Sequence, residues 1–172
     1  MQLIFMMAIG LMIITIASMG SNKITDTTVN EAQAAAAHMA VYHTAAVNYC
    51  KETTCASGII STNSVKSKMS TGIANGPLLT QQLFTSNYDA PSKTVVTYMK
   101  PTFALRGSVN FATVNSALRD LEGADTSSFG RWDGSAKKVA PSYVDGLKVN
   151  YSIPSGISAV LANGSPVIVN VL

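Results

Sequence analysis

The chain has 172 residues, a formal net charge of +3 at neutral pH and a pI near 8.9. This length allows one folded head with an appendage, but not two full globular domains. Its 12 Lys and Arg residues are scattered rather than clustered, which argues against nucleic acid as a partner. Charged residues make up only 12% of the chain, against about 25% in an ordinary soluble domain, so part of the chain is not expected to face water.

The deficit of charge is concentrated at the N-terminal end. Residues 1–22 contain no ionisable side chain, and residues 3–19 read LIFMMAIGLMIITIASM. A helix that crosses a bilayer needs about 20 mostly apolar residues, with a lower limit near 17. Residues 1–22 therefore predict a transmembrane anchor, and the membrane is the first partner that we expect.

A cleaved secretory signal is the alternative interpretation of the same segment. The small residues Ser18 and Gly20 stand at the two positions that a cut before Ser21 would require. Against cleavage, no Lys or Arg precedes the apolar run, and no proline separates this run from the Ala-rich segment after it. A cleaved chain would be a periplasmic or secreted protein, either a hydrolase without a recognisable motif or a ligand-binding module.

Residues 23–56 predict a helical stalk. Neither Pro nor Gly occurs there, and Ala, the best helix former, dominates the sequence. One stripe recurs at steps of four and three and predicts a face that packs on a sheet or on another helix. The stripe consists of Ala35, Met39, Tyr42, Ala46 and Tyr49. Because no proline lies between Ile13 and Cys50, anchor and stalk are expected to form one continuous or gently bent helix.

The two cysteines, Cys50 and Cys55, lie close together in the sequence CKETTC. An oxidising compartment would join them in a disulfide, and two unpaired thiols are the alternative. Closing so short a loop stabilises the fold by about 2 kcal/mol. The pair is therefore predicted to staple the end of the stalk helix.

Residues 57–172 predict a small head. Residues 56–93 are rich in Ser, Thr, Asn and Gly and suggest irregular connections, with a short helix over 78–84 after Pro77. Residues 94–99 and 102–106 predict short strands near a sheet edge, because Pro101 interrupts them. Asn110 predicts the N-terminal cap of a helix over 111–122, and Gly123 is expected to close it.

The last third of the head predicts further strands. Residues 124–145 are polar and turn-rich, whereas residues 147–153 alternate as a half-buried strand does, in a sheet that faces water on one side. A turn at 162–165 leads to PVIVNVL, which predicts a terminal strand in the same sheet. The expected fold class is α+β, with a transmembrane helix over 1–22, a helical stalk over 23–56 packed on the head, and an antiparallel sheet in residues 57–172.

The histidines, cysteines and other candidate chemical residues do not form a known catalytic or metal-binding motif. His38 and His43 are five apart, which turns them about 140° from each other on a helix and prevents a shared metal. His43 would lie about 10 Å from Cys50, too far to activate it as a nucleophile. Ser135 and Lys138 form an SxxK without its companion motifs. We therefore expect no catalytic residue, metal, cofactor or small-molecule substrate.

Three residues of the turn-rich segment leave two interpretations open. Phe129, Arg131 and Trp132 are of types that favour protein interfaces, so they could form an exposed contact surface. They could equally anchor a surface loop to the core.

The order of segments resembles the architecture of type IV pilins, in which an apolar N-terminal helix continues into an amphipathic helix before a small head with an antiparallel sheet. Within that group the chain is similar to the PilM-type biogenesis proteins of plasmid-encoded thin type IV pilus systems, which differ from the actin-like proteins of the same name. The resemblance rests on MQLIFMMAIGLMIITIASM, MAVYHTAAVNYC and SIPSGISAVLANGSPVIVNVL. The middle hundred residues carry little of it.

The chain departs from true pilin subunits in two respects. Pilins have a short basic leader that ends in Gly, and a Glu near the start of the apolar segment that guides docking in the filament; here Gly10 is followed by LMIITIAS. The resemblance therefore implies an accessory component rather than the filament body. It implies a single-pass inner-membrane protein with a periplasmic head that binds other pilus-assembly proteins or pilins, a conjugative plasmid system being one setting, and it offers no catalytic residue to carry over.

Overall fold

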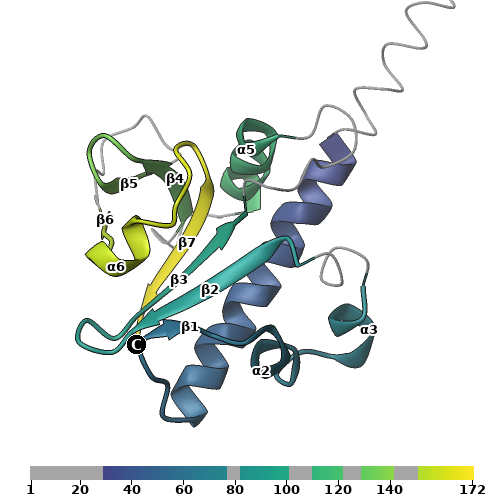
Figure 1. The fold of residues 1–172 in the computed structure, drawn as a ribbon. Helices are drawn as coiled ribbons and strands as arrows, with labels where there is room; N and C mark the ends of the chain where they lie inside the picture. The colour runs from purple at the N-terminus through teal and green to yellow at the C-terminus, as the bar shows by residue number, and fades with distance from the viewer. Residues whose placement is uncertain (1–28, 77–81, 101–109, 122–128, 142–150) are drawn as a thin grey trace, which may run out of the picture.

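The computed structural model describes residues 29–76, 82–100, 110–121, 129–141 and 151–172. In these ranges a long helix over residues 29–52 lies against a seven-stranded sheet with the order β1-β2-β3-β7-β4-β5-β6 (Figure 1). Every pair of neighbouring strands is antiparallel. The predicted α+β class, with a long helix on an antiparallel sheet, is confirmed.

The elements are short apart from the long helix and α5. The strands are β1 Gly58–Ile59, β2 Phe84–Asp89, β3 Thr94–Met99, β4 Phe129–Asp133, β5 Lys138–Pro141, β6 Tyr151–Ser152 and β7 Pro166–Val171. The other helices are α2 Thr62–Lys66, α3 Thr71–Ala74, α5 Phe111–Leu121 and α6 Ser155–Ser158.

Both faces of the central sheet are covered. The long helix and α5 enclose a core with Val95 and Ile168 on one face, while Trp132 and Ile157 pack in a second core with Val96 and its neighbours (Figure 1). All six residues of β3 are buried. The prediction that residues 94–99 lie near a sheet edge is wrong, because β2 and β7 flank β3. The prediction that the sheet faces water on one side is wrong for β3, which has a core on each face, but it describes β4 and β5, where Arg131 and Lys138 are exposed and Trp132 and Val139 are buried.

The long helix forms because Ala dominates its sequence and neither Pro nor Gly interrupts it. Thr53 follows its last turn, and both the backbone N–H and the hydroxyl of Thr53 donate to the Tyr49 carbonyl, at 2.9 and 2.6 Å. None of the helices in the described ranges is both long and apolar enough to cross a membrane. The predicted anchor over residues 1–22 and its continuity with the stalk lie outside the described residues.

α5 begins where the sequence predicts. The Asn110 side-chain oxygen accepts hydrogen bonds from the backbone N–H groups of Ala112 and Thr113, at 2.9 and 3.1 Å, and the Thr113 hydroxyl accepts one from the Asn110 N–H. Val114 and Leu118 then face the core. The cap is confirmed, whereas the predicted closing residue Gly123 lies outside the described residues.

The sequence pattern did not predict two parts of the sheet. β2 occupies part of the segment predicted as irregular connection, and the predicted helix over 78–84 is wrong at its end because Phe84 opens β2; residues 77–81 lie outside the described part. β4 and β5 form a hairpin inside the segment predicted to be turn-rich. In contrast, the terminal strand β7 is confirmed and lies between β3 and β4.

Two other strand predictions are described only in part. The predicted strand over 102–106 lies outside the described residues. Of the predicted strand over 147–153, only its end is described, as β6 followed by the buried Ile153. The predicted turn at 162–165 is confirmed by a 3.0 Å hydrogen bond from the Ser165 N–H to the Ala162 carbonyl.

The turn of the β4–β5 hairpin contains an aspartate that accepts backbone hydrogen bonds and a lysine in a strained backbone conformation. The Asp133 carboxylate accepts hydrogen bonds from the N–H groups of Ser135 and Ala136, which bring the chain round. Lys137 then takes a φ of 52°, in the left-handed region that disfavours residues with a Cβ. The hairpin is therefore built with a residue that is not the best for its backbone conformation.

Replacing Lys137 by glycine should raise the free energy of unfolding by about 0.5–1 kcal/mol, because glycine adopts this φ without strain. Chemical denaturation of the two proteins measures the difference. The matched control is Lys138→Gly one residue later, in strand β5, which should destabilise the protein by a similar amount because glycine weakens strands. Equal losses in both variants would contradict the assignment of strain to Lys137.

Candidate functional site

The predicted stripe of the long helix is the helix face that meets the sheet. Ala35, Met39, Tyr42 and Ala46 are at most 1% exposed, and Tyr49 is half-buried against the same core. The Tyr42 ring lies 6.0 Å from the Phe84 ring, centroid to centroid, in a tilted arrangement that aromatic pairs favour. These side chains are therefore occupied by the head's own sheet in the folded protein.

A polar chain crosses this helix–sheet interface. His43 is 6% exposed, and its Nδ1 atom lies 2.9 Å from the Thr97 hydroxyl of β3. The Thr97 hydroxyl lies 2.6 Å from the Ser86 hydroxyl of β2. The alternation of strand residues explains the contact, because Ser86 and Thr97 are paired directly across the two strands and point to the same face.

Two atoms of the interface lack a hydrogen-bond partner among the described residues. They are the second ring nitrogen of His43, Nε2, and the hydroxyl oxygen of Tyr42. Burial raises the pKa of the Tyr42 hydroxyl, and the nearby Thr62 side chain offsets part of this rise. Burial also lowers the pKa of His43, from 6.5 to about 4, because it disfavours the charged ring.

The Ser86–Thr97–His43 chain is positioned to hold the helix on the sheet, not to react with a substrate. Ser86 and Thr97 are fully buried, so no external molecule can reach either hydroxyl in the folded state. A nucleophile must approach its substrate within about 3–3.5 Å. These hydrogen-bonded side chains fix one register of the long helix against β2 and β3. Apolar contacts alone would specify that register less sharply.

The two histidines point in different directions. His38 is half-buried, and its Nδ1 atom lies 2.8 Å from the Ala34 carbonyl of the same helix. His43 is buried on the sheet side. The described ranges contain no group of three His, Cys, Asp or Glu side chains that could hold a metal ion.

The end of the long helix is fastened by a disulfide. Cys50 and Cys55 are bonded, with their Cα atoms 5.2 Å apart, and Cys50 is largely buried. An ion pair between Lys68 and Glu52 joins the same region to the residues after α2. Cys50 is therefore no free nucleophile in this state, and the bond ties the helix end to the segment that leads into β1.

Replacing both Cys50 and Cys55 by serine should lower the free energy of unfolding by about 2 kcal/mol, because the unfolded chain regains the entropy that this short loop removes. Denaturation of the oxidised wild type and the double variant measures the loss. Reduced wild type serves as the control and should behave like the variant. If reduction leaves the stability unchanged, the bond does not stabilise the fold.

The remaining sequence candidates lie in the β4–β5 hairpin. Ser135 lies in the β4–β5 turn, where its hydroxyl donates to the Asp133 carboxylate, and Lys138 is exposed on β5. In the group with two interpretations, Trp132 is only 2% exposed, Phe129 is half-buried against the first core, and Arg131 is exposed. The interpretation of Trp132 as a core anchor is therefore the one that holds.

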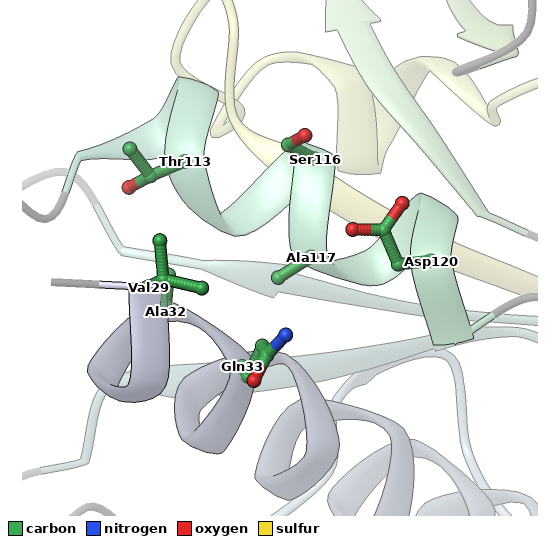
Figure 2. Close-up of a pocket in the computed structure, with 7 residues that line it drawn as sticks. All are labelled: Val29, Ala32, Gln33, Thr113, Ser116, Ala117 and Asp120. Atoms are coloured by element: carbon green, nitrogen blue, oxygen red, sulfur yellow. The ribbon is translucent and has the colours of Figure 1, made fainter. Parts of the chain in front are cut away.

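A shallow groove runs between the long helix and α5, which the sequence pattern did not indicate. Figure 2 shows Val29, Ala32 and Gln33 on the long helix facing the side chains of α5 across it. The groove has a volume of about 200 Å³. Its α5 wall consists of Thr113, Ser116, Ala117 and Asp120. It is smaller than the roughly 300–1,000 Å³ of typical ligand pockets.

Comparisons with known proteins give no match. No protein-family model, no curated protein and no solved structure matches this chain.

Proposed function

We propose that this protein is a membrane-anchored, non-enzymatic accessory component of type IV pilus assembly, with its head in the periplasm. The observation that carries the proposal is the long helix over residues 29–52, which comes after an apolar, uncharged segment in the sequence and packs along an antiparallel sheet. This combination is the pilin-like architecture that the sequence resembles. The disulfide between Cys50 and Cys55 supports an oxidising location for the head.

The geometry of the described residues favours an interaction role over catalysis. Their Ser–Thr–His chain is buried, and the groove beside α5 is small and open. A hydrolase needs a nucleophile that its substrate can reach. We therefore assign the head a binding role, with pilus-assembly subunits as its partners.

The first test determines whether the N-terminal segment is retained as a membrane anchor. Intact-mass analysis of membrane and soluble fractions, with and without reduction, should find the full-length oxidised chain in the membrane fraction. A soluble species that begins at Ser21 would instead support a secreted protein and overturn the anchor.

The second test identifies the proteins that the head contacts. A photo-crosslinking residue placed at Val41, which is 38% exposed on the long helix, should form adducts with a pilus or inner-membrane assembly subunit in cells that carry a type IV pilus system. The same probe at Lys137, in the exposed β4–β5 turn, is the matched control for a different surface. Adducts with no such subunit from either position would contradict the proposed role.

A further inference from the structure

His43 is the one side chain with an ordinary pKa near neutrality that the described part of the chain buries. Its ring stands between the long helix and the sheet, and its contact with Thr97 is the polar link from this helix face to β3. The opposite ring nitrogen has no hydrogen-bond partner among the described residues. Within the described part of the chain, the ring is therefore hydrogen-bonded through Nδ1 alone.

The protonation state of the ring decides whether this arrangement is favourable. A neutral imidazole has one N–H group that donates and one nitrogen that accepts a hydrogen bond. The Thr97 hydroxyl, which also contacts Ser86, can either accept from Nδ1–H or donate to Nδ1. In the charged imidazolium both nitrogens are donors. The Nε2–H group would then be a charged donor in a buried place without an acceptor among the described residues, which is costly.

The titratable groups around the ring offer no negative charge near neutral pH. The long helix contributes Tyr42 and Tyr49 to this core, while Cys50 is held in the disulfide. β2 contributes Tyr88, on the same face as Ser86, and neither β3 nor β7 contributes a titratable side chain to this face. Tyrosine is neutral at pH 5–7, so none of these groups stabilises a charged ring.

Charged side chains on the neighbouring elements lie at the ends or on the outside. Asp120 of α5 is exposed and lines the groove beside Gln33, and Gln33 itself lies ten helical residues, or about 15 Å, before His43. Glu52 is nine residues along the helix in the other direction and is paired with Lys68. The other charged residues on these helices are Glu31, Lys51, Lys66 and Arg119, and all of them are exposed or half-buried. Burial is accordingly the cause that lowers the pKa of His43.

We propose that His43 is an acid-sensitive latch: its neutral ring fastens the long helix to β3, and its protonation at mildly acidic pH loosens the helix from the sheet. The latch joins the stalk to the head, so opening it would change how the two are held together. The stated role is a property of the fold and does not depend on which partner the head binds.

The sign and size of the effect follow from linkage. Because the folded-state pKa of about 4 is below the ordinary 6.5, the open state binds the proton more readily, and closure is favoured most above pH 6.5 and progressively less as the pH falls toward 4. These two values predict that the equilibrium shifts toward the open state by about 20-fold between pH 7 and pH 5.

Hydrogen exchange on the full-length chain in detergent tests the latch. Between pH 7 and pH 5, the protection factors of amides over residues 39–47, corrected for the intrinsic pH dependence of exchange, should fall about 20-fold more in the wild type than in His43→Gln. Glutamine can keep a hydrogen bond to Thr97 but does not gain charge in this range. His38→Gln, which changes the half-buried histidine of the same helix, is the matched control and should behave like the wild type.

A second measurement keeps the test decisive if His43→Gln does not fold. In His38→Gln, His43 is the only histidine of the chain, so its ring signal can be followed by NMR without ambiguity. A ring that stays neutral in the folded state until well below pH 6.5, while helix protection falls, supports the latch. A ring that titrates near 6.5 with unchanged helix protection overturns it, as does an equal pH dependence in wild type and His43→Gln.

Discussion

Replacing Trp132 by alanine is expected to lower the free energy of unfolding by about 3–5 kcal/mol, as truncation of a large buried aromatic side chain generally does. The ring is 2% exposed and packs in the second core with Val139, Ile157 and Val167. The indole fills the space between the β4–β5 hairpin and the central strands, and its own backbone is tied to the 162–165 turn by hydrogen bonds. Thermal or chemical denaturation measures the loss.

The control for this prediction is the neighbouring residue on the same strand. Arg131 is exposed, so Arg131→Ala should change the free energy of unfolding by no more than about 0.5 kcal/mol. The pair distinguishes a core anchor from a contact surface. A small effect of Trp132→Ala together with a loss of partner binding would restore the contact-surface interpretation.

Replacing Met39 by alanine is expected to cost about 2–5 kcal/mol, because the side chain is fully buried where the long helix meets the sheet. The helix lies close to the strands there, since Ala35, Ala36 and Ala46 carry small side chains, and a cavity between such neighbours cannot collapse easily. Denaturation of the variant gives the value, and its helix content shows whether the helix detaches.

Val41 provides the comparison for Met39. It lies on the same helix, two residues further along, but its side chain is 38% exposed. Val41→Ala should therefore change stability by about 0.5 kcal/mol or less, and alanine's better helix propensity partly offsets the lost contact. Similar losses at both positions would mean that the predicted stripe does not define the packed face.

Local signals predicted a large part of this fold. The Ala-rich sequence without Pro or Gly predicted the long helix, Asn110 predicted the start of α5, and the β-branched residues of β3 and β7 predicted two paired strands. In each case the residues nearby in sequence suffice, because a propensity or a cap acts within one element. The stripe from Ala35 to Ala46 belongs to the same class, since its spacing follows the helical repeat.

The regions that were missed depend on contacts between distant residues. β2 reads FTSNYD, and its polar side chains suggested a connection, yet Ser86 is buried because Thr97 of the next strand provides a hydrogen-bond partner. The β4 sequence FGRWD has few strand-forming residues apart from its aromatics, and its place in the sheet depends on β7, more than 30 residues later. The helix sequence presents His43 only as a candidate metal ligand or base, because no local pattern shows that Thr97, 54 residues later, contacts its ring.

The place of β7 sets an order of events during synthesis. β7 is the last strand in the sequence, and it is the strand that joins β1–β3 to β4–β6. Until residues 166–171 have been synthesised and have paired, β3 and β4 each have one edge of unpaired N–H and C=O groups. A nascent head that lacks β7 therefore carries two unpaired strand edges at its centre, and such edges are open to wrong pairing until the closing strand is inserted between them.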